Sequence, residues 1–423
     1  MGGWRAESYS PVVTLMLVRL TRRHFFTAAL ATALCLAAPN LATPEPLWIL
    51  HCVAGLESEA VNLIAEAFGE AGGGAARVTA DEDGEVRARL LAAADEPAPD
   101  VLITYSQHLP FLADGGRIVS LTEVLPDAPW DDYVSGALDN VTYRGKRWAI
   151  PIEGNPYGLF CNLALFRDAG IRRLPTTWDE TLAAAERLTA DTDGDGQIDR
   201  WGYTQCTFQL PLLLFAYGCD YLSPDGTDAG FDNQAGLDAL RLYVRLRRLS
   251  PSVNFERNDI GMKVSVLDNL ARYAHLDYAV IGLPRGTMRA NTFGGSSGVL
   301  CLAVADGPRA DDALAFVRFW LRPDMSLRWS TSSDNIPLRR SILEGLAYER
   351  YLMERPRVRA LVAELPYCRP RPCRRAYIEI QDALANVSHE ARALDNPTDA
   401  QLKAILERAA ARVRKALAEE RAG

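Results

Sequence analysis

The chain has 423 residues, a length that predicts two or three domains with sizeable hydrophobic cores. Hydrophobic residues make up 48% and charged residues 24%, which is ordinary globular usage and excludes a largely disordered, collagen-like or disulfide-dense chain. The 46 basic residues are outnumbered by 54 acidic ones, for a formal charge of −8, so nucleic acid is not an expected partner.

The first 44 residues have the pattern of an export signal. Arg22 and Arg23 precede an uncharged apolar run over residues 25–38, and Pro39 follows it. A helix of that length spans roughly 21 Å, short of a bilayer core of about 30 Å, so cleavage is expected rather than anchoring. The paired arginines resemble the twin-arginine signal, although an ordinary secretory signal with two fortuitous arginines is the alternative.

These features predict a periplasmic protein. Met16 would begin a signal of more usual length, and we expect cleavage between Ala38 and Pro46. Cys35 lacks the preceding residues of a lipoprotein box, so lipid anchoring is not favoured. Cleavage would remove four arginines and one glutamate and leave a more acidic mature chain.

Seven cysteines remain after the leader, an odd number, so at least one is free if no intermolecular bridge forms. Cys368 and Cys373 flank Arg-Pro-Arg-Pro and lie close enough in sequence for a small-loop disulfide in an oxidising compartment. A zinc site is not favoured, because neither Cys-x-x-Cys nor a nearby histidine pair occurs.

Strands and helices alternate along the mature chain. This alternation predicts an α/β fold with buried strands. The apolar pattern predicts strands over residues 47–53, 100–104, 147–152 and 299–305, and helices over 57–68, 109–114, 181–188, 210–217, 236–249, 310–321 and 398–418. Thr177 and Glu180 have the spacing of a capping box, as do Thr398 and Gln401. No segment after the leader is apolar over the length that a membrane span needs.

Motifs for catalysis are weak. Residues 294–298 match Gly-x-Ser-x-Gly, but an apolar β-like run follows where a nucleophile elbow needs a helix, so a glycine-rich turn explains them better. His389-Glu390 lacks the second histidine of a zinc protease. A glycosidase stays open, because its two carboxylates usually come from distant strands.

The segment 191–199 resembles the first part of a calcium loop. Asp191, Asp193, Asp195 and Asp199 stand at positions one, three, five and nine, with glycine at position six. Position twelve is Gly202, where a bidentate glutamate is expected. A structural Ca²⁺ is therefore one interpretation, and a polar turn in which aspartates cap backbone amides is the other. We expect no other cofactor.

The order of several segments resembles the extracellular solute-binding proteins of bacterial ABC importers, in the branch that includes maltose-binding protein and other sugar and glycerol-phosphate receptors. No single motif is very specific, but their order covers nearly all of the mature chain. The segments are 99–103, 112–116, 145–151, 162–170, 175–180, the Asp-Gly-Asp-Gly insertion, 261–263, 279–284, 294–304, 335–337 and the terminal helix.

The resemblance implies a type II periplasmic binding fold, with two α/β lobes joined by crossing hinge segments and a ligand cleft between them. The first lobe would comprise residues 46–152 with about 297–340, and the second 153–296 with part of 341–423. Crossings are expected near residues 150–154, near 295–300 and before the C-terminal helices.

The family's cleft segments suggest the solute-binding side chains. A sugar needs amides or carboxylates for its hydroxyls and aromatic rings for its apolar face. The candidates are Tyr105, Gln107, Glu153, Asn155, Tyr157, Phe208, Gln209, Asp268, Ser296 and Tyr377. Each has an alternative as an ordinary surface or core residue.

Asp268 stands where many sugar receptors carry a tryptophan. This departure weakens the case for a long oligosaccharide, and an acid in the cleft disfavours a phosphorylated ligand. The resemblance therefore implies a monomeric periplasmic protein that catalyses no reaction, binds a small sugar, polyol or cationic solute, and delivers it to a membrane permease with its ATPase subunits. The alternative is an exported hydrolase of glycosides or esters.

Overall fold

The computed structural model describes residues 45–81, 98–250, 255, 258–294, 298–302 and 309–422. Residues 46–423 form one compact unit. The expected export signal at 1–44 and the candidate Ser296 lie outside the described residues. No helix among the described residues is long and apolar enough to span a membrane.

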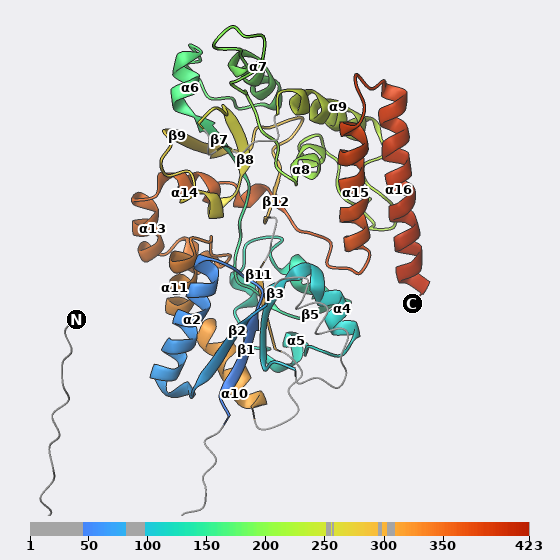
Figure 1. Ribbon diagram of the computed structural model, residues 1–423. Helices are drawn as coiled ribbons and strands as arrows, with labels where there is room; N and C mark the ends of the chain where they lie inside the picture. The colour runs from blue at the N-terminus through green and yellow to red at the C-terminus, as the bar shows by residue number, and fades with distance from the viewer. Residues whose placement is uncertain are drawn as a thin grey trace, which may run out of the picture. The chain divides into compact units, whose positions relative to one another are not determined.

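Two sheets organise this unit (Figure 1). Among the described residues the first sheet has the strand order β2-β1-β3-β11-β6, in which β1, β2 and β3 are parallel and β11 is antiparallel to both of its neighbours. Its strands are β1 (Leu47–His51), β2 (Ala76–Ala80), β3 (Val101–Tyr105), β6 (Ile150–Pro151) and β11 (Gly298–Leu302). Strands β1 and β3 are almost continuously buried, because helices cover both faces of the sheet.

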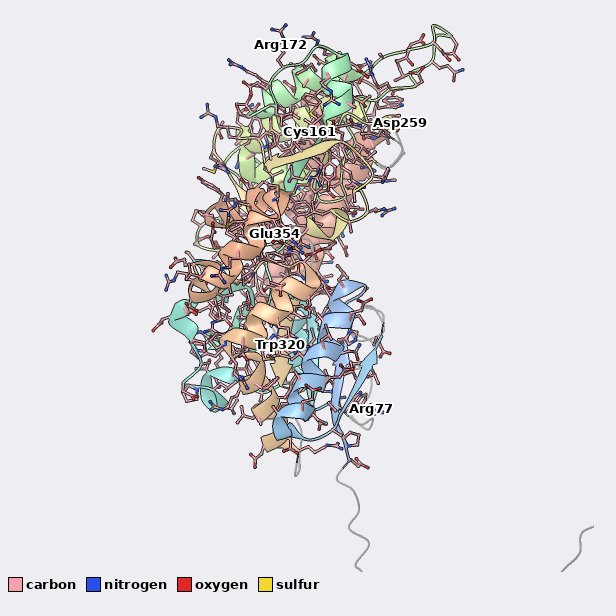
Figure 2. All side chains as sticks on the ribbon, turned by 90° about the vertical axis from the view of Figure 1, so that its left-hand side faces the viewer. Arg77, Cys161, Arg172, Asp259, Trp320 and Glu354 are labelled. Atoms are coloured by element: carbon pink, nitrogen blue, oxygen red, sulfur yellow. The ribbon has the colours of Figure 1, made fainter. Side chains whose placement is uncertain are left out.

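Helices pack on both sides of the first sheet (Figure 1). They are α2 (Leu56–Phe68), α10 (Ala310–Trp320) and α11 (Pro323–Ser333) on one side, and α4 (Leu109–Asp114) and α5 (Leu121–Val124) on the other. Phe68, at the end of α2, meets Phe316 of α10 edge to face at a ring distance of 5.2 Å. Figure 2 shows Trp320 among these helices and Cys161 in the second sheet.

The second sheet has the order β8-β7-β9, and both outer strands are antiparallel to β7. Its strands are β7 (Gly158–Asn162), β8 (Met262–Ser265) and β9 (Tyr278–Gly282). Around it lie α6 (Leu163–Asp168), α7 (Trp178–Leu188), α8 (Gln209–Ala216), α9 (Gln234–Arg248), α14 (Pro356–Val362), α15 (Tyr377–Arg392) and α16 (Asp399–Ala422). The α/β class predicted from the sequence is confirmed.

Short elements complete the chain. The strands are β4 (Thr142–Tyr143), β5 (Lys146–Arg147), β10 (Asn291–Thr292) and β12 (Cys368–Arg369), and the helices are α12 (Arg340–Leu343) and α13 (Leu346–Met353). Single turns of 3₁₀ or π helix are η1 (Gly69–Gly73), η2 (Ser106–His108), η3 (Trp130–Asp132), η4 (Leu138–Val141), η6 (Leu267–Asn269) and η7 (Leu365–Tyr367).

Both predicted capping motifs are present. The Thr177 hydroxyl accepts from the Glu180 amide at 3.1 Å while the Glu180 carboxylate accepts from the Thr177 amide, which fixes the start of α7. Thr398 and Gln401 exchange equivalent bonds at the start of α16. Local hydrogen-bonding chemistry therefore sets these two boundaries.

The strand predicted over residues 147–152 is wrong as a single element. Strand β5 ends at Arg147 and pairs with β4 in a small hairpin, whereas β6 begins at Ile150 and joins the first sheet. Trp148 lies between them and donates its indole N–H to the Tyr143 carbonyl at 3.0 Å, so it belongs to the hairpin. One apolar run thus serves two different sheets.

The disulfide between Cys368 and Cys373 that the sequence left open is not formed, and both thiols are free. Cys368 donates to the Thr292 carbonyl at 3.3 Å, beside the paired strands β10 and β12. Cys373 packs instead against the small core cluster that contains Cys52 and Cys301. The two thiols belong to different cores, because the proline-containing segment between them extends the chain.

Candidate functional site

Three distant segments meet where the chain passes from the first sheet to the second. The Gly154 and Ile336 backbones exchange hydrogen bonds of 2.8 and 3.1 Å, and the Asn155 amide donates to the Phe293 carbonyl at 2.8 Å. The strand pair β10–β12 adds the segment that leads to α15. These contacts lie between the two sheets, close to the expected crossings near 150–154 and before the C-terminal helices.

A buried carboxylate cluster lies at this junction. Glu153, which is 1% exposed, accepts hydrogen bonds from the Gly298 amide at 3.0 Å and from the Asn335 amide nitrogen at 2.8 Å. The same Asn335 nitrogen donates to Glu57, in the first turn of α2, at 2.9 Å. One asparagine therefore links an acid of α2 to an acid that directly follows β6.

The acids of this cluster resist ionisation. Burial raises the pKa of Glu153 well above its usual range, and the negative charges of Glu57 and Asp268 raise it further. Burial also raises the pKa of Glu57 to about 7, although the hydrogen bond from Asn335 opposes the change. At neutral pH the cluster therefore retains part of its protons.

Asn155 connects the cluster to η6, which follows strand β8 of the second sheet. This side chain is 1% exposed, and its amide nitrogen donates to Asp268 at 2.7 Å while its oxygen accepts from the Leu267 amide at 2.9 Å. Asp268 is itself exposed, yet the surrounding protein raises its pKa.

A stacked pair of aromatic rings includes Tyr157, two residues after Asn155 in the chain. Tyr157 and Phe208 stack with a ring distance of 5.9 Å and an interplanar angle of 3°. The Arg371 guanidinium lies 5.4 Å from the centre of the Phe208 ring and 6.0 Å from that of Tyr377. Phe208 is half-buried, so one edge of the stack is open to a solute.

Arg371 is a buried cation at the same junction. It is 2% exposed, its backbone amide donates to the Asn140 side chain at 2.8 Å, and its guanidinium donates to the Gly294 carbonyl. Gly294 has φ of 120°, and a Cβ there would lie 2.5 Å from the Asn155 carbonyl oxygen. Only glycine allows these segments to approach so closely.

The remaining predicted residues differ in exposure. Tyr105, at the end of β3, pairs with Gly298, and Gln107 follows it in η2; both are half-buried at the edge of the first sheet. Gln209 is fully buried and accepts from the Tyr203 hydroxyl at 2.5 Å. Tyr377 is 1% exposed and meets Tyr221 edge to face. Contact of these four side chains with a solute remains a prediction.

Three residues of the junction were not among the candidates: Glu57, Asn335 and Arg371. Asn335 belongs to a segment that carried the family resemblance, so that segment was the available signal. Glu57 looked like one more acid in a helical first turn, and Arg371 like part of a proline-rich loop. Their importance arises from tertiary contacts, which sequence spacing does not encode.

The aspartate loop has the geometry of a tight polar turn. Carboxylate oxygens of Asp191, Asp193 and Asp195 lie within 4.8 Å of one another, and all three residues are exposed. Asp191 accepts from two glycine amides at 2.7 and 2.8 Å, which lowers its pKa. Asp199 accepts from the Thr192 amide and hydroxyl. Calcium binding remains a prediction.

Position twelve of the calcium pattern is closed to any side chain. A Cβ on Gly202 would lie 1.9 Å from the Ala185 carbonyl oxygen of α7. The loop is packed against this helix through the glycine backbone. The departure from the calcium pattern therefore has a packing cause.

A cavity of about 490 Å³ lies elsewhere, between the end of α4 and the C-terminal helices. Phe111 and Arg144 line one side, and charged residues of α15 and α16 line the other. At its margin Asp114 accepts from the Tyr143 hydroxyl at 2.9 Å and pairs with Arg375 at 3.5 Å. None of the predicted solute-binding residues lines this cavity.

The chain resembles known binding proteins in sequence over about half of its length. Residues 54–259 match the model of the bacterial extracellular solute-binding proteins. A Brucella abortus protein named as a binding protein is 24% identical over 292 residues, which cover 64% of this chain and 69% of that protein.

Solved structures share the fold. The cyclic α-maltosyl-1,6-maltose binding protein of Arthrobacter globiformis has a TM-score of 0.75 and 23% identity over 88% of this chain and 99% of its own. UgpB of Mycobacterium tuberculosis, solved with glycerophosphocholine, has a TM-score of 0.75 and 18% identity over 88% and 98%. A Thermotoga lettingae solute-binding protein with bound α-D-tagatose has a TM-score of 0.73 and 22% identity over 88% and 98%.

Proposed function

We propose that this chain, which resembles the bacterial extracellular solute-binding proteins in sequence and fold, is one of them and captures a small sugar or polyol for an ABC importer. The observation that carries the proposal is the junction between the two sheets. There, Asn155 binds the exposed carboxylate Asp268, and the stacked Tyr157 ring follows two residues later in the chain. A solute with hydroxyl groups and an apolar ring face needs that combination.

The two kinds of side chain have separate tasks. The open edge of the Tyr157–Phe208 stack would cover an apolar sugar face, and Asp268 would accept hydroxyl protons. Asn155 holds the backbone of η6 in place and so orients Asp268. Glu153 would position Asn335 and the start of β11 rather than move a proton on the solute.

Solute binding is proposed to favour a closed arrangement of the lobes. A solute that contacts both sheets stabilises the arrangement in which both sets of contacts form, and a hinge need involve only a few backbone positions. Gly294 supplies one such position, because its left-handed backbone conformation is strained for any other residue. The boundaries of the two lobes remain a prediction from the sequence.

The proposed partners follow from the family. The closed protein would dock on a membrane permease that is driven by ATPase subunits, and we expect the receptor itself to act as a monomer. It would reach the periplasm through the twin-arginine-like signal, which would be cleaved after export. Capture without turnover separates this proposal from an exported hydrolase.

A structural Ca²⁺ at the aspartate loop is a separate proposal. Asp191, Asp193 and Asp195 would supply its carboxylate oxygens. Its role would be to stiffen the connection after α7, far from the solute. Loss of thermal stability on addition of a chelator, reversed by Ca²⁺ and not by Mg²⁺, would support it.

The function can be tested on the purified mature protein. Isothermal titration calorimetry against monosaccharides, disaccharides and polyols should identify a solute that binds. Chromatography of the same mixtures should recover that solute chemically unchanged. Release of sugar from chromogenic glycosides, or of acid from esters, would contradict the proposal.

A further inference from the structure

The carboxylates of the junction are hydrogen-bonded to amide groups. Among the described residues, Glu57, Glu153 and Asp268 accept hydrogen bonds from amides and form no ion pair with arginine or lysine. Arg371, the buried cation nearby, donates instead to the Gly294 carbonyl and lies over two aromatic rings. Without a counter-charge, buried acids retain protons, and Glu57 and Glu153 also hydrogen-bond to each other, so ionisation of the cluster requires a cation.

A second observation also indicates a missing donor. The Asn335 side chain is 1% exposed, and its nitrogen already donates to both Glu57 and Glu153. Its oxygen is buried and has no hydrogen-bond partner among the described residues. A buried amide oxygen without a donor is uncommon and indicates a group that completes the site.

One chemical group meets both requirements. A protonated amine offers up to three N–H donors and one positive charge, whereas a hydroxyl offers one donor and no charge. Bound near Glu57, Glu153 and Asp268, it would offset their mutual repulsion and supply a donor to Asn335. The stacked Tyr157 and Phe208 rings remain available for the rest of the solute.

We propose that the solute is an amino sugar or amino polyol, whose ammonium group is held by Glu57, Glu153, Asp268 and the Asn335 oxygen. This inference rests on the proposed function and narrows its substrate class. It also assigns Glu57 and Asn335 to solute binding, in addition to the acids that the sequence suggested.

The pH dependence of solute binding should follow the ionisation of the carboxyl groups in the cluster. The groups that face the Glu57 carboxyl are Glu153, Asp268 and the neutral Asn335 amide, and burial with these charges keeps the cluster partly protonated near neutral pH. A cation is held best by ionised acids. Affinity for an ammonium solute should therefore rise with pH through about 7, the pKa of Glu57.

The experiment uses matched solute pairs that differ in one amino group. Calorimetry of the purified mature protein with glucamine and sorbitol, glucosamine and glucose, and galactosamine and galactose measures the preference directly. We expect at least one amino member to bind at least tenfold more tightly than its neutral partner. For glucamine, whose amine stays protonated, affinity should rise severalfold from pH 6 to pH 8.

Substitutions assign the preference to the cluster. Glu57→Gln and Asp268→Asn should each reduce the affinity of the amino solute about tenfold and that of its neutral partner less than threefold. Asp127→Asn, which removes an exposed acid paired with Arg318, is the matched control and should leave both unchanged. Circular dichroism of each variant confirms that it is folded.

The outcomes separate the two proposals. If neutral solutes bind as tightly as their amino partners, or if mass spectrometry of solute released from the protein finds no basic nitrogen, the amino inference is overturned and the transport function stands. If no solute of the panel binds and none is released on denaturation, the proposed function fails and the inference fails with it. A released solute with a basic nitrogen supports both.

Discussion

Phe208 shows how a single ring can be tested at the site. Its stacked partner Tyr157 is buried, so Phe208 presents the open edge of the pair. Phe208→Leu keeps apolar volume and removes the ring, and it should weaken solute binding by about 0.5–1.5 kcal/mol. Calorimetry measures the change, with Tyr367→Leu as a control at an exposed ring under Arg289. Equal losses of solute affinity in both variants would show that Phe208 does not contact the solute.

Glu57 makes a prediction about stability and pH. Its pKa is about 7 in the folded protein against an ordinary value of 4.5, so the folded state binds more protons than the unfolded state between those values. The free energy of unfolding therefore falls as pH rises through this window. Glu57→Gln removes this contribution and should be more stable than the wild type at pH 8 by about 1–2 kcal/mol, but similar at pH 4.5.

Urea denaturation of the solute-free protein at both pH values measures this difference. Glu59→Gln, at an exposed position of the same helix, is the control and should follow the wild-type curve. If the stability of the Glu57→Gln variant changes with pH as that of the wild type does, the surroundings of Glu57 do not raise its pKa.

Some candidate residues could be proposed from local sequence segments, whereas others depend on contacts between distant parts of the chain. Glu153, Asn155 and Asp268 could be proposed because each stands in a segment whose order along the chain resembles the family. Glu57 could not, because its approach to Asn335 spans 278 positions in sequence. Gln209 was proposed from its position ahead of a helix, yet its side chain turns into the core, where Tyr203 supplies its donor. The direction of a side chain depends on packing that the local pattern does not encode.

At the scale of elements, helix starts were the most predictable feature. The capping box at Thr177 is local chemistry, and the helix begins where the motif places it. Thr177→Ala removes the acceptor for the Glu180 amide and should cost about 1 kcal/mol of unfolding free energy, measured by urea denaturation. Thr227→Ala, in an exposed turn, is a control that caps no helix. Equal stability of the Thr177 variant and the wild type would mean that packing alone fixes α7.

Short strands were less predictable. The run from Arg147 to Ile152 looked like one strand, but its two ends pair in different sheets. Strand identity requires a partner, and partners such as β11 arrive from about 150 residues later in the chain. The helices, by contrast, satisfy most of their backbone bonds internally, so periodicity and caps were sufficient to locate them.

The aspartate loop offers a test in which the sequence pattern and the packing disagree. The pattern suggests that Gly202→Glu would complete a calcium loop and increase Ca²⁺ affinity. The structure predicts the opposite, because a Cβ at this position would overlap the Ala185 carbonyl oxygen. We expect a loss of about 1–3 kcal/mol in stability and no gain in Ca²⁺ affinity.

Thermal denaturation with and without Ca²⁺ measures both quantities. Ile198→Ala, exposed in the same loop, is the matched control and should leave stability nearly unchanged. A stable Gly202→Glu variant with tighter Ca²⁺ binding would contradict the packing argument and favour the metal interpretation.

At the scale of the whole mature chain, the fold was predictable because the order of many weak segments is jointly specific. The order of segments along the chain does not indicate how the two sheets face one another. That relationship depends on buried contacts such as Asn155 with Asp268, and Glu153 with Asn335, which join residues 113 and 182 positions apart. Solute recognition depends on the same contacts, so the fold was easier to predict than the solute.

The contact between α4 and the segment before α15 gives a prediction about lobe closure. Asp114 lies at the end of α4 and is bound by Tyr143 and Arg144, while Arg375 reaches it from beside the C-terminal helices. If the solute is held in an arrangement that includes this contact, Asp114→Asn should weaken binding although it touches no solute. A partly exposed ion pair contributes about 0.2–1 kcal/mol, so we expect a two- to fivefold loss of affinity.

The salt dependence of solute affinity tests the same contact. Wild-type affinity should fall slightly between 50 and 300 mM NaCl as the pair is screened, and the Asp114→Asn protein should lack this part of the salt dependence. Asp127→Asn removes a more exposed pair that lies wholly beside the first sheet, so it should retain the wild-type salt profile. Small-angle scattering with saturating solute should show the wild type and both variants reaching the same compact state, because the solute still bridges the two sheets. Full affinity in the Asp114 variant, with an unchanged salt profile, would mean that closure does not involve this contact.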